Sequence, residues 1–197
     1  MIDYEAELNE MISLKNLMNS YKLYFLKAII VNVSSARREF SFYEMACWMC
    51  AYSFADVCSI GNRIRPLDKL YDVAVMAIEK ENLMESSTIS EVYDAVFNTK
   101  DKELRRSVMS LCNFVPYRLL AYLVLDELKG KTDKQKNQII EELSRGDNRC
   151  VYAIYSISGD KKSIEVNPDW ASFIREHRTK LIPWVDQKID TFIWRKY

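Results

Sequence analysis

The sequence contains few glycines, few prolines and a single histidine. Four Gly and four Pro among 197 residues argue against an all-β fold, because such folds need many tight turns. The glycines, Gly61, Gly130, Gly146 and Gly159, are too far apart to form a glycine-rich phosphate loop. As the sole histidine, His177 cannot contribute to a His-rich metal site, and we interpret it as a partly exposed surface residue.

Long apolar runs and secretion signals are also absent. Residues 1–10 are acidic and lack the basic start and apolar run of a signal peptide. The most apolar stretch, 23–33, contains Lys27 and Asn32 and is too short to cross a bilayer. The five cysteines are odd in number and have no spacing typical of a disulfide framework. The sequence therefore predicts a soluble, cytoplasmic protein with reduced thiols and no membrane association.

The length and composition are those of one globular domain. A 49% hydrophobic and 28% charged chain of 197 residues can bury roughly 70% of its unfolded surface without disulfides. We expect a mainly α fold, a compact multi-helix orthogonal bundle. It forms a single domain over residues 1–197, with one small β-hairpin as an appendage near residues 149–166.

Apolar residues that recur about every 3.6 positions, with capping residues at their ends, locate the expected helices. These cover approximately residues 3–18, 20–33, 42–59, 66–81, 88–97, 101–111, 116–130, 132–146 and 167 onward. Pro183 either kinks the last helix or begins another. Ser41, Thr88 and Thr132 each open a capping box. The strand formers of 151–157 and 164–166, on either side of Gly159–Asp160, predict the hairpin.

Two patterns allow catalytic or metal chemistry, but a structural interpretation is favoured for both. Cys47 and Cys50 have the spacing of half a zinc site, whereas a structural zinc needs four ligands. Their apolar neighbours indicate small core residues instead. Pro168-Asp169 followed by Asp186-Gln187-Lys188 loosely fits a metal-dependent nuclease pattern. That chemistry needs carboxylates on adjoining strands, and both segments are predicted to be helical.

The basic residues are the more informative group. Residues 1–98 hold nine Lys/Arg against fourteen Asp/Glu, whereas residues 99–197 hold nineteen against fourteen. The positive C-terminal half permits an anionic partner. Arginines at helix ends or in loops can bind phosphate, with Tyr and Trp nearby for stacking. The candidate nucleic-acid-binding residues are Arg37, Arg38, Arg63, Arg65, Arg105, Arg106 and Arg118. For any single one of them, an ion pair or a helix-end contact is the favoured alternative.

Several segments, in order, resemble a known family. They are Tyr21 to Ile29, Phe40 to Ala46, Asn113 to Leu120 and Asn167 to Trp170, followed by a closing helix with Trp184 and Phe192. This order resembles the helical N-terminal region of a group of bacterial proteins that end in an HNH-type endonuclease module. The resemblance covers nearly the whole chain and rests on structural motifs.

The resemblance implies that the nuclease module would follow the end of this sequence. HNH chemistry uses a histidine as general base and further His, Asn or Asp residues to hold a divalent metal. No such residue can be assigned here, so we expect no cofactor in this chain. The leading hypothesis is a non-catalytic module of an HNH-type nuclease system that positions DNA or a nuclease subunit. The alternative is a protein-interaction or homo-oligomerisation module with no nucleic-acid role.

Overall fold

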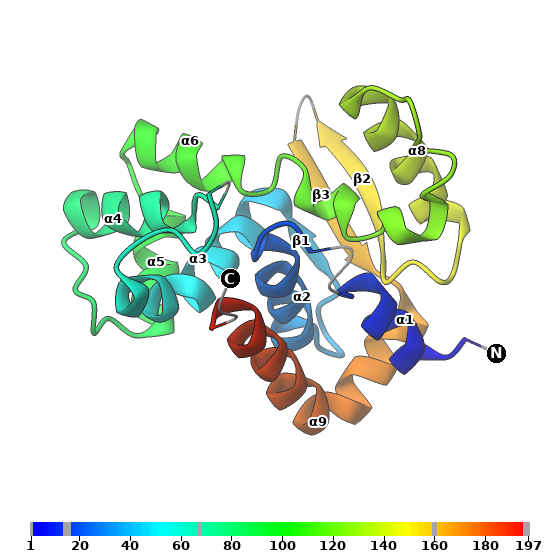
Figure 1. Cartoon of the computed structure of the whole chain (residues 1–197), viewed down its shortest axis with the longest axis horizontal. Helices are drawn as coiled ribbons and strands as arrows, with labels where there is room; N and C mark the ends of the chain where they lie inside the picture. Colours follow the sequence, from blue (N-terminus) through cyan, green and yellow to red (C-terminus); the bar gives the residue numbers. More distant parts are fainter. Residues whose placement is uncertain (1, 14–16, 67, 159–160, 195–197) are drawn as a thin grey trace.

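The structure, a computed structural model, describes residues 2–13, 17–66, 68–158 and 161–194. Its elements follow the chain in the order α1 (Tyr4–Met11), α2 (Tyr21–Asn32), β1 (Glu39–Ser41), α3 (Phe42–Ile60), α4 (Leu70–Glu81), α5 (Ile89–Asn98), α6 (Lys102–Ser110), α7 (Val115–Arg118), the 3-10 helix η2 (Ala121–Val124), α8 (Asp133–Gly146), β2 (Tyr152–Ser158), β3 (Lys161–Val166) and α9 (Pro168–Ile193). The fold is mainly α with a small β element, as the sequence predicts (Figure 1).

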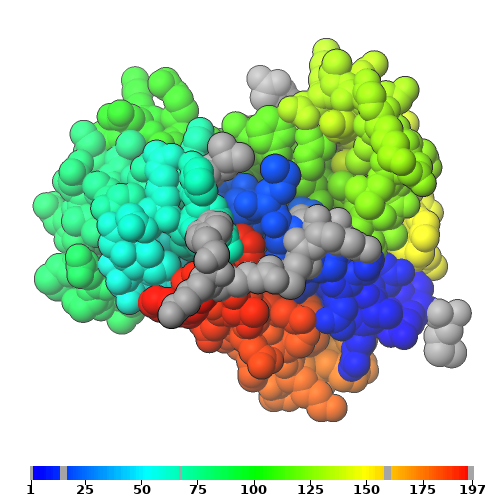
Figure 2. Space-filling view, in the orientation of Figure 1, coloured from blue at the N-terminus to red at the C-terminus, as the bar shows by residue number. Residues whose placement is uncertain are grey.

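Helix α2 lies at the centre of the molecule. It packs against α3, α7 and α9, and its buried side chains run from Leu23 through Ile30. In Figure 1, α4, α5 and α6 lie to one side of α2, whereas β2, β3 and α8 lie to the other. The same division is visible on the surface in Figure 2, where α9 closes the lower edge. Buried apolar residues from Leu8 to Phe192 form one continuous cluster.

Most of the predicted helix ends are confirmed. Thr88 and Thr132 form complete capping boxes at the starts of α5 and α8. Gly61 ends α3 with a φ of 70°, a left-handed conformation that favours glycine. At the start of α3 the predicted box is only half formed. The Ser41 hydroxyl accepts from the Glu44 amide, but the Glu44 carboxylate binds a guanidinium instead.

Three predicted helix boundaries are wrong. Helix α1 ends at Met11, and residues 14–16 of its predicted extension lie outside the described residues. Helix α4 begins at Leu70 rather than at Pro66, because the Asp68 carboxylate accepts from the Leu70 amide and sets the helix start. The apolar run 119–128 forms turns and η2.

The predicted hairpin is present and is part of a three-stranded antiparallel sheet with strand order β1-β3-β2. No element was predicted between the helices expected at 20–33 and 42–59, so strand β1 was missed. Phe40 of β1 lies opposite Ile164 of β3, and both side chains are buried. The hairpin turn predicted at Gly159–Asp160 lies outside the described residues.

Helix α9 is continuous over 26 residues and contains Pro183. A proline inside a helix removes one backbone hydrogen bond and bends the axis. Figure 1 shows this bend along the lower edge of the molecule. Pro183 therefore kinks the last helix and does not begin another. None of the helices in the described ranges combines the length and apolar character needed to cross a membrane.

Candidate nucleic-acid interface

The exposed face of α6 carries the first half of the candidate site. Lys102, Arg105 and Arg106 are three and four residues apart, which places them on the same side of a helix. All three are exposed. Leu104 and Val108 on the opposite side are fully buried and hold α6 against α3 and α4. The packing of α6 therefore directs its cationic side chains outward.

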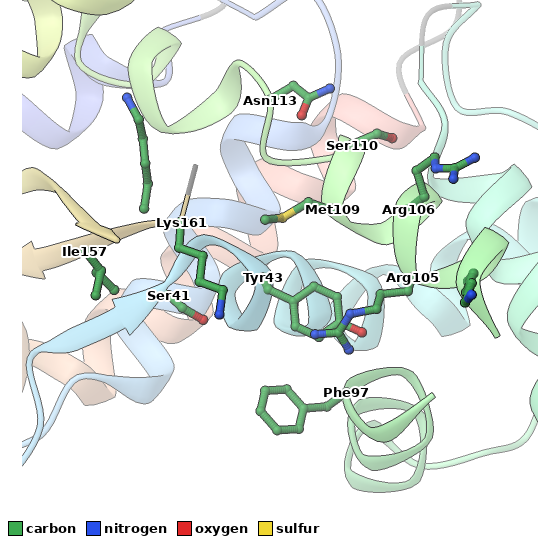
Figure 3. A pocket seen from close by; sticks show the side chains of 12 residues that line it. Ser41, Tyr43, Phe97, Arg105, Arg106, Met109, Ser110, Asn113, Ile157 and Lys161 are labelled. Atoms are coloured by element: carbon green, nitrogen blue, oxygen red, sulfur yellow. The ribbon is translucent and has the colours of Figure 1, made fainter. Parts of the chain in front are cut away.

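A groove of about 790 Å³ separates this face from the start of β3. Figure 3 shows Arg105 extending across Tyr43, and Lys161 reaching toward Ser41 and Tyr43 from the hairpin. The groove is lined by Ser41, Tyr43, Phe97, Lys102, Arg105, Arg106, Met109, Ser110, Asn113, Ile157, Lys161 and Lys162. We call it the α6 groove.

The charge of the α6 groove is of one sign among the described residues that line it. Five of them are Lys or Arg, and none is Asp or Glu. All five cations come from the C-terminal half, which the sequence marked as positive. Concave surfaces lined by one sign of charge concentrate the electric field and attract counter-charged ligands. The α6 groove is therefore suited to a polyanion.

Three of these cations have no ion pair or hydrogen bond within the described part of the chain. They are Lys102, Arg106 and Lys161, and all three are exposed. Cations without a carboxylate partner attract solvent counterions, which a polyanionic ligand can displace with a gain in entropy. Lys162 differs, since its ammonium lies 2.5 Å from a carboxylate oxygen of Glu141. Burial lowers the pKa of Lys162, but the bonds to Glu141 and Tyr117 outweigh it and raise that pKa overall.

Arg105 and Tyr43 form a fixed wall of the groove. The guanidinium carbon of Arg105 lies 4.0 Å from the centre of the Tyr43 ring, within the range of a cation–π contact. The Tyr43 hydroxyl donates to the carbonyl oxygen of Val96 at 2.8 Å. Burial raises the pKa of Tyr43, so it remains a neutral donor. The planar guanidinium is thereby held in place with its edge available to a phosphate.

The floor next to this wall is aromatic. Phe97 lies 5.9 Å from Tyr43, measured between ring centres, and 39% of its surface is exposed. Phe97 also stacks with Tyr93 at 5.4 Å between ring centres, and Tyr93 stacks on Trp48 at 3.8 Å. An exposed ring beside phosphate-binding cations is the arrangement that proteins use to stack a nucleobase.

The structure does not bring the seven candidate arginines together. Only Arg105 and Arg106 line the α6 groove. Four others bind carboxylates: Arg37 binds Glu44 at 2.5 Å, Arg38 binds Glu165 at 3.1 Å, Arg63 binds Asp72 at 2.5 Å, and Arg118 binds Asp133 at 2.5 Å. Arg65 packs on the Phe192 ring at 4.7 Å and donates to the Phe192 carbonyl. For these five arginines the structure shows the ion pairs and helix-end contacts that were the alternative to phosphate binding.

The remaining candidates lie elsewhere. Cys47 and Cys50 are buried core residues, as expected, and burial raises the pKa of the Cys50 thiol to about 12. Asp169 and Asp186 both lie in α9, and Asp186 binds Lys27 at 2.7 Å. His177 is partly exposed and stacks on Phe173. Among the described residues, no group of three or more His, Cys, Asp or Glu could hold a metal ion.

Sequence reasoning missed Tyr43, Phe97, Lys102, Lys161 and Lys162. The spacing of Lys102 relative to Arg105 and Arg106 could have revealed one cationic face on a capped helix. The hairpin lysines gave no such signal. Their approach to α6 depends on the pairing of β3 with β1, and β1 was missed.

No protein-family model, curated protein or solved structure matches this chain. The chemistry of the groove must therefore be inferred from its own geometry.

Proposed function

We propose that this chain binds nucleic acid in the α6 groove, chiefly through the phosphate backbone. The observation that carries the proposal is the set of five cations, with no carboxylate among the described lining residues. Lys102, Arg106 and Lys161 would contact phosphates, and Arg105 would present its fixed edge to another. Phosphate contacts supply affinity and orientation without reading the base sequence.

The wider role in this proposal is that of a non-catalytic module. The resemblance to the helical region of HNH-type endonuclease proteins supports a nuclease system, in which this chain would position DNA for cleavage by another module. A protein-interaction or homo-oligomerisation role is the competing outcome. It predicts no salt-dependent binding to nucleic acid.

The test is fluorescence anisotropy with labelled single- and double-stranded DNA at several salt concentrations. We expect binding whose logarithm falls linearly with the logarithm of salt concentration, because each neutralised phosphate releases counterions. Replacing Arg106→Gln together with Lys161→Gln should weaken binding about tenfold at low salt. The same change should reduce the salt slope by about one for each lost contact.

A matched control removes the same charge elsewhere. Arg63→Gln together with Lys129→Gln also removes one guanidinium and one ammonium, but those groups are paired with Asp72 and Asp126. This double variant should bind DNA almost as the unaltered chain does. Equal loss in both double variants would show that net charge alone matters, and the α6 groove would then not be the site.

A further inference from the structure

A second groove lies apart from the first, between the N-terminal end of α2 and the segment from α7 to η2. Its volume is about 600 Å³, within the range of small-molecule sites. It is lined by Met18, Asn19, Tyr21, Lys22, Phe114, Val115, Arg118, Ala121, Leu125 and Asp133. We call it the Lys22 groove.

The walls of the Lys22 groove are apolar and open to solvent. Met18 is 78% exposed, Phe114 48% and Leu125 49%. Large apolar side chains gathered at this level of exposure in one hollow commonly mark a binding site. The apolar walls exclude a polyanion such as nucleic acid as the occupant, because its phosphates would lose hydration there without compensation.

The described residues that line the groove carry one more positive than negative charge. Arg118 is paired with Asp133 at 2.5 Å. Lys22 is partly buried and has no ion pair or hydrogen bond with any described residue. Burial, together with the nearby Arg118, lowers the pKa of Lys22 to about 8. A partly desolvated ammonium without a partner is unfavourable, and a bound anion relieves that cost.

We infer that the Lys22 groove binds an amphipathic monocarboxylate, a small molecule with one carboxylate and an aliphatic chain. The carboxylate pairs with the Lys22 ammonium and provides the negative partner that Lys22 lacks among the described residues. The chain lies against Met18, Phe114 and Leu125. A single negative charge matches the single unpaired cation, and the apolar walls select for the chain rather than for a second polar group.

The test uses decanoate as the probe, below the concentration at which it forms micelles, with isothermal titration calorimetry. Decanoate should bind at least tenfold more tightly than decanol, which has the same chain and no charge, and more tightly than hexanoate. Lys22→Met should reduce decanoate affinity about tenfold and leave decanol affinity unchanged. Lys180→Met, which removes an exposed lysine of α9, serves as the matched control and should have no effect.

Proton uptake provides a second readout. A bound carboxylate favours the charged ammonium, so it should raise the pKa of Lys22, and binding at pH 8 should take up a fraction of a proton. Titrations in two buffers with different ionisation enthalpies measure this uptake, which should vanish in Lys22→Met. Equal affinities for decanoate and decanol, or undiminished decanoate binding in Lys22→Met, would overturn the inference.

Discussion

Replacing Trp170 by alanine is expected to lower the free energy of unfolding by about 3–5 kcal/mol. Trp170 is fully buried near the start of α9. The Tyr4 ring of α1 meets it edge-on, with 4.7 Å between ring centres, and Phe173 lies 6.1 Å away. Alanine would leave a large cavity and remove one contact between α1 and α9, whereas the stacking of Tyr4 on Phe173 would remain. Urea denaturation followed by circular dichroism would measure the loss.

Trp170→Phe is the informative control. The indole nitrogen of Trp170 is buried and has no hydrogen-bond partner in the described part of the chain, a condition that costs about 1–3 kcal/mol. Phenylalanine removes this unsatisfied group while keeping an aromatic ring against Tyr4. We therefore expect a loss well below that of alanine. Equal losses in the two variants would show that the six-membered ring fails to fill the site.

The second large effect is expected at Asp68, where replacement by alanine should cost about 3 kcal/mol. One carboxylate oxygen accepts from the amide of Leu70 at 3.0 Å, at the start of α4. The other accepts from both the amide and the hydroxyl of Ser20, at the start of α2. Asp68 thus satisfies free amides at two helix N-termini, and its loss leaves them buried and unpaired.

The raised pKa of Asp68 predicts in which direction its contribution to stability changes with pH. Burial raises the pKa of Asp68, and this outweighs the hydrogen bonds from Ser20, which lower it. The folded state therefore holds more protons than the unfolded state between the two pKa values. The stabilising contribution of Asp68 falls as pH rises through its folded pKa. The stability advantage of the unaltered chain over Asp68→Asn should shrink as pH rises above about 4, the ordinary pKa of an aspartate, and through the raised folded pKa. An advantage that grows with pH would contradict the raised pKa.

The sequence identified the helices best where local chemistry determines them. Thr88 and Thr132 form their boxes within one helical turn, so a short stretch of sequence contains all the partners. The sequence did not identify elements whose position depends on a residue far away along the chain. The start of α4 depends on the link between Asp68 and Ser20, and strand β1 exists because β3 pairs with it. Neither pairing leaves a periodic signal in its own segment.

The candidate site shows the same contrast between features set by local sequence and features set by distant contacts. Arg105 and Arg106 were selected because the sequence places them among the arginines at helix ends or in loops. Arg63 was selected on the same grounds, yet Asp72 of α4 pairs with it. Sequence reasoning could locate cations but could not tell which had carboxylates within reach. The distinction required the three-dimensional arrangement of α4, α6 and the hairpin.

The pairing of β1 with β3 also determines when strand β1 can fold during synthesis of the chain. Glu39 must meet Glu165, so β1 stays without its partner until β3, more than 120 residues later, has left the ribosome. Such distant contacts slow folding, because the intervening loop must close first. Helix α3 begins directly after β1, so the start of a core helix adjoins an open strand edge during this interval. An open edge of this kind can pair with other chains. A chain that stops before β3 should therefore aggregate in proportion to its concentration.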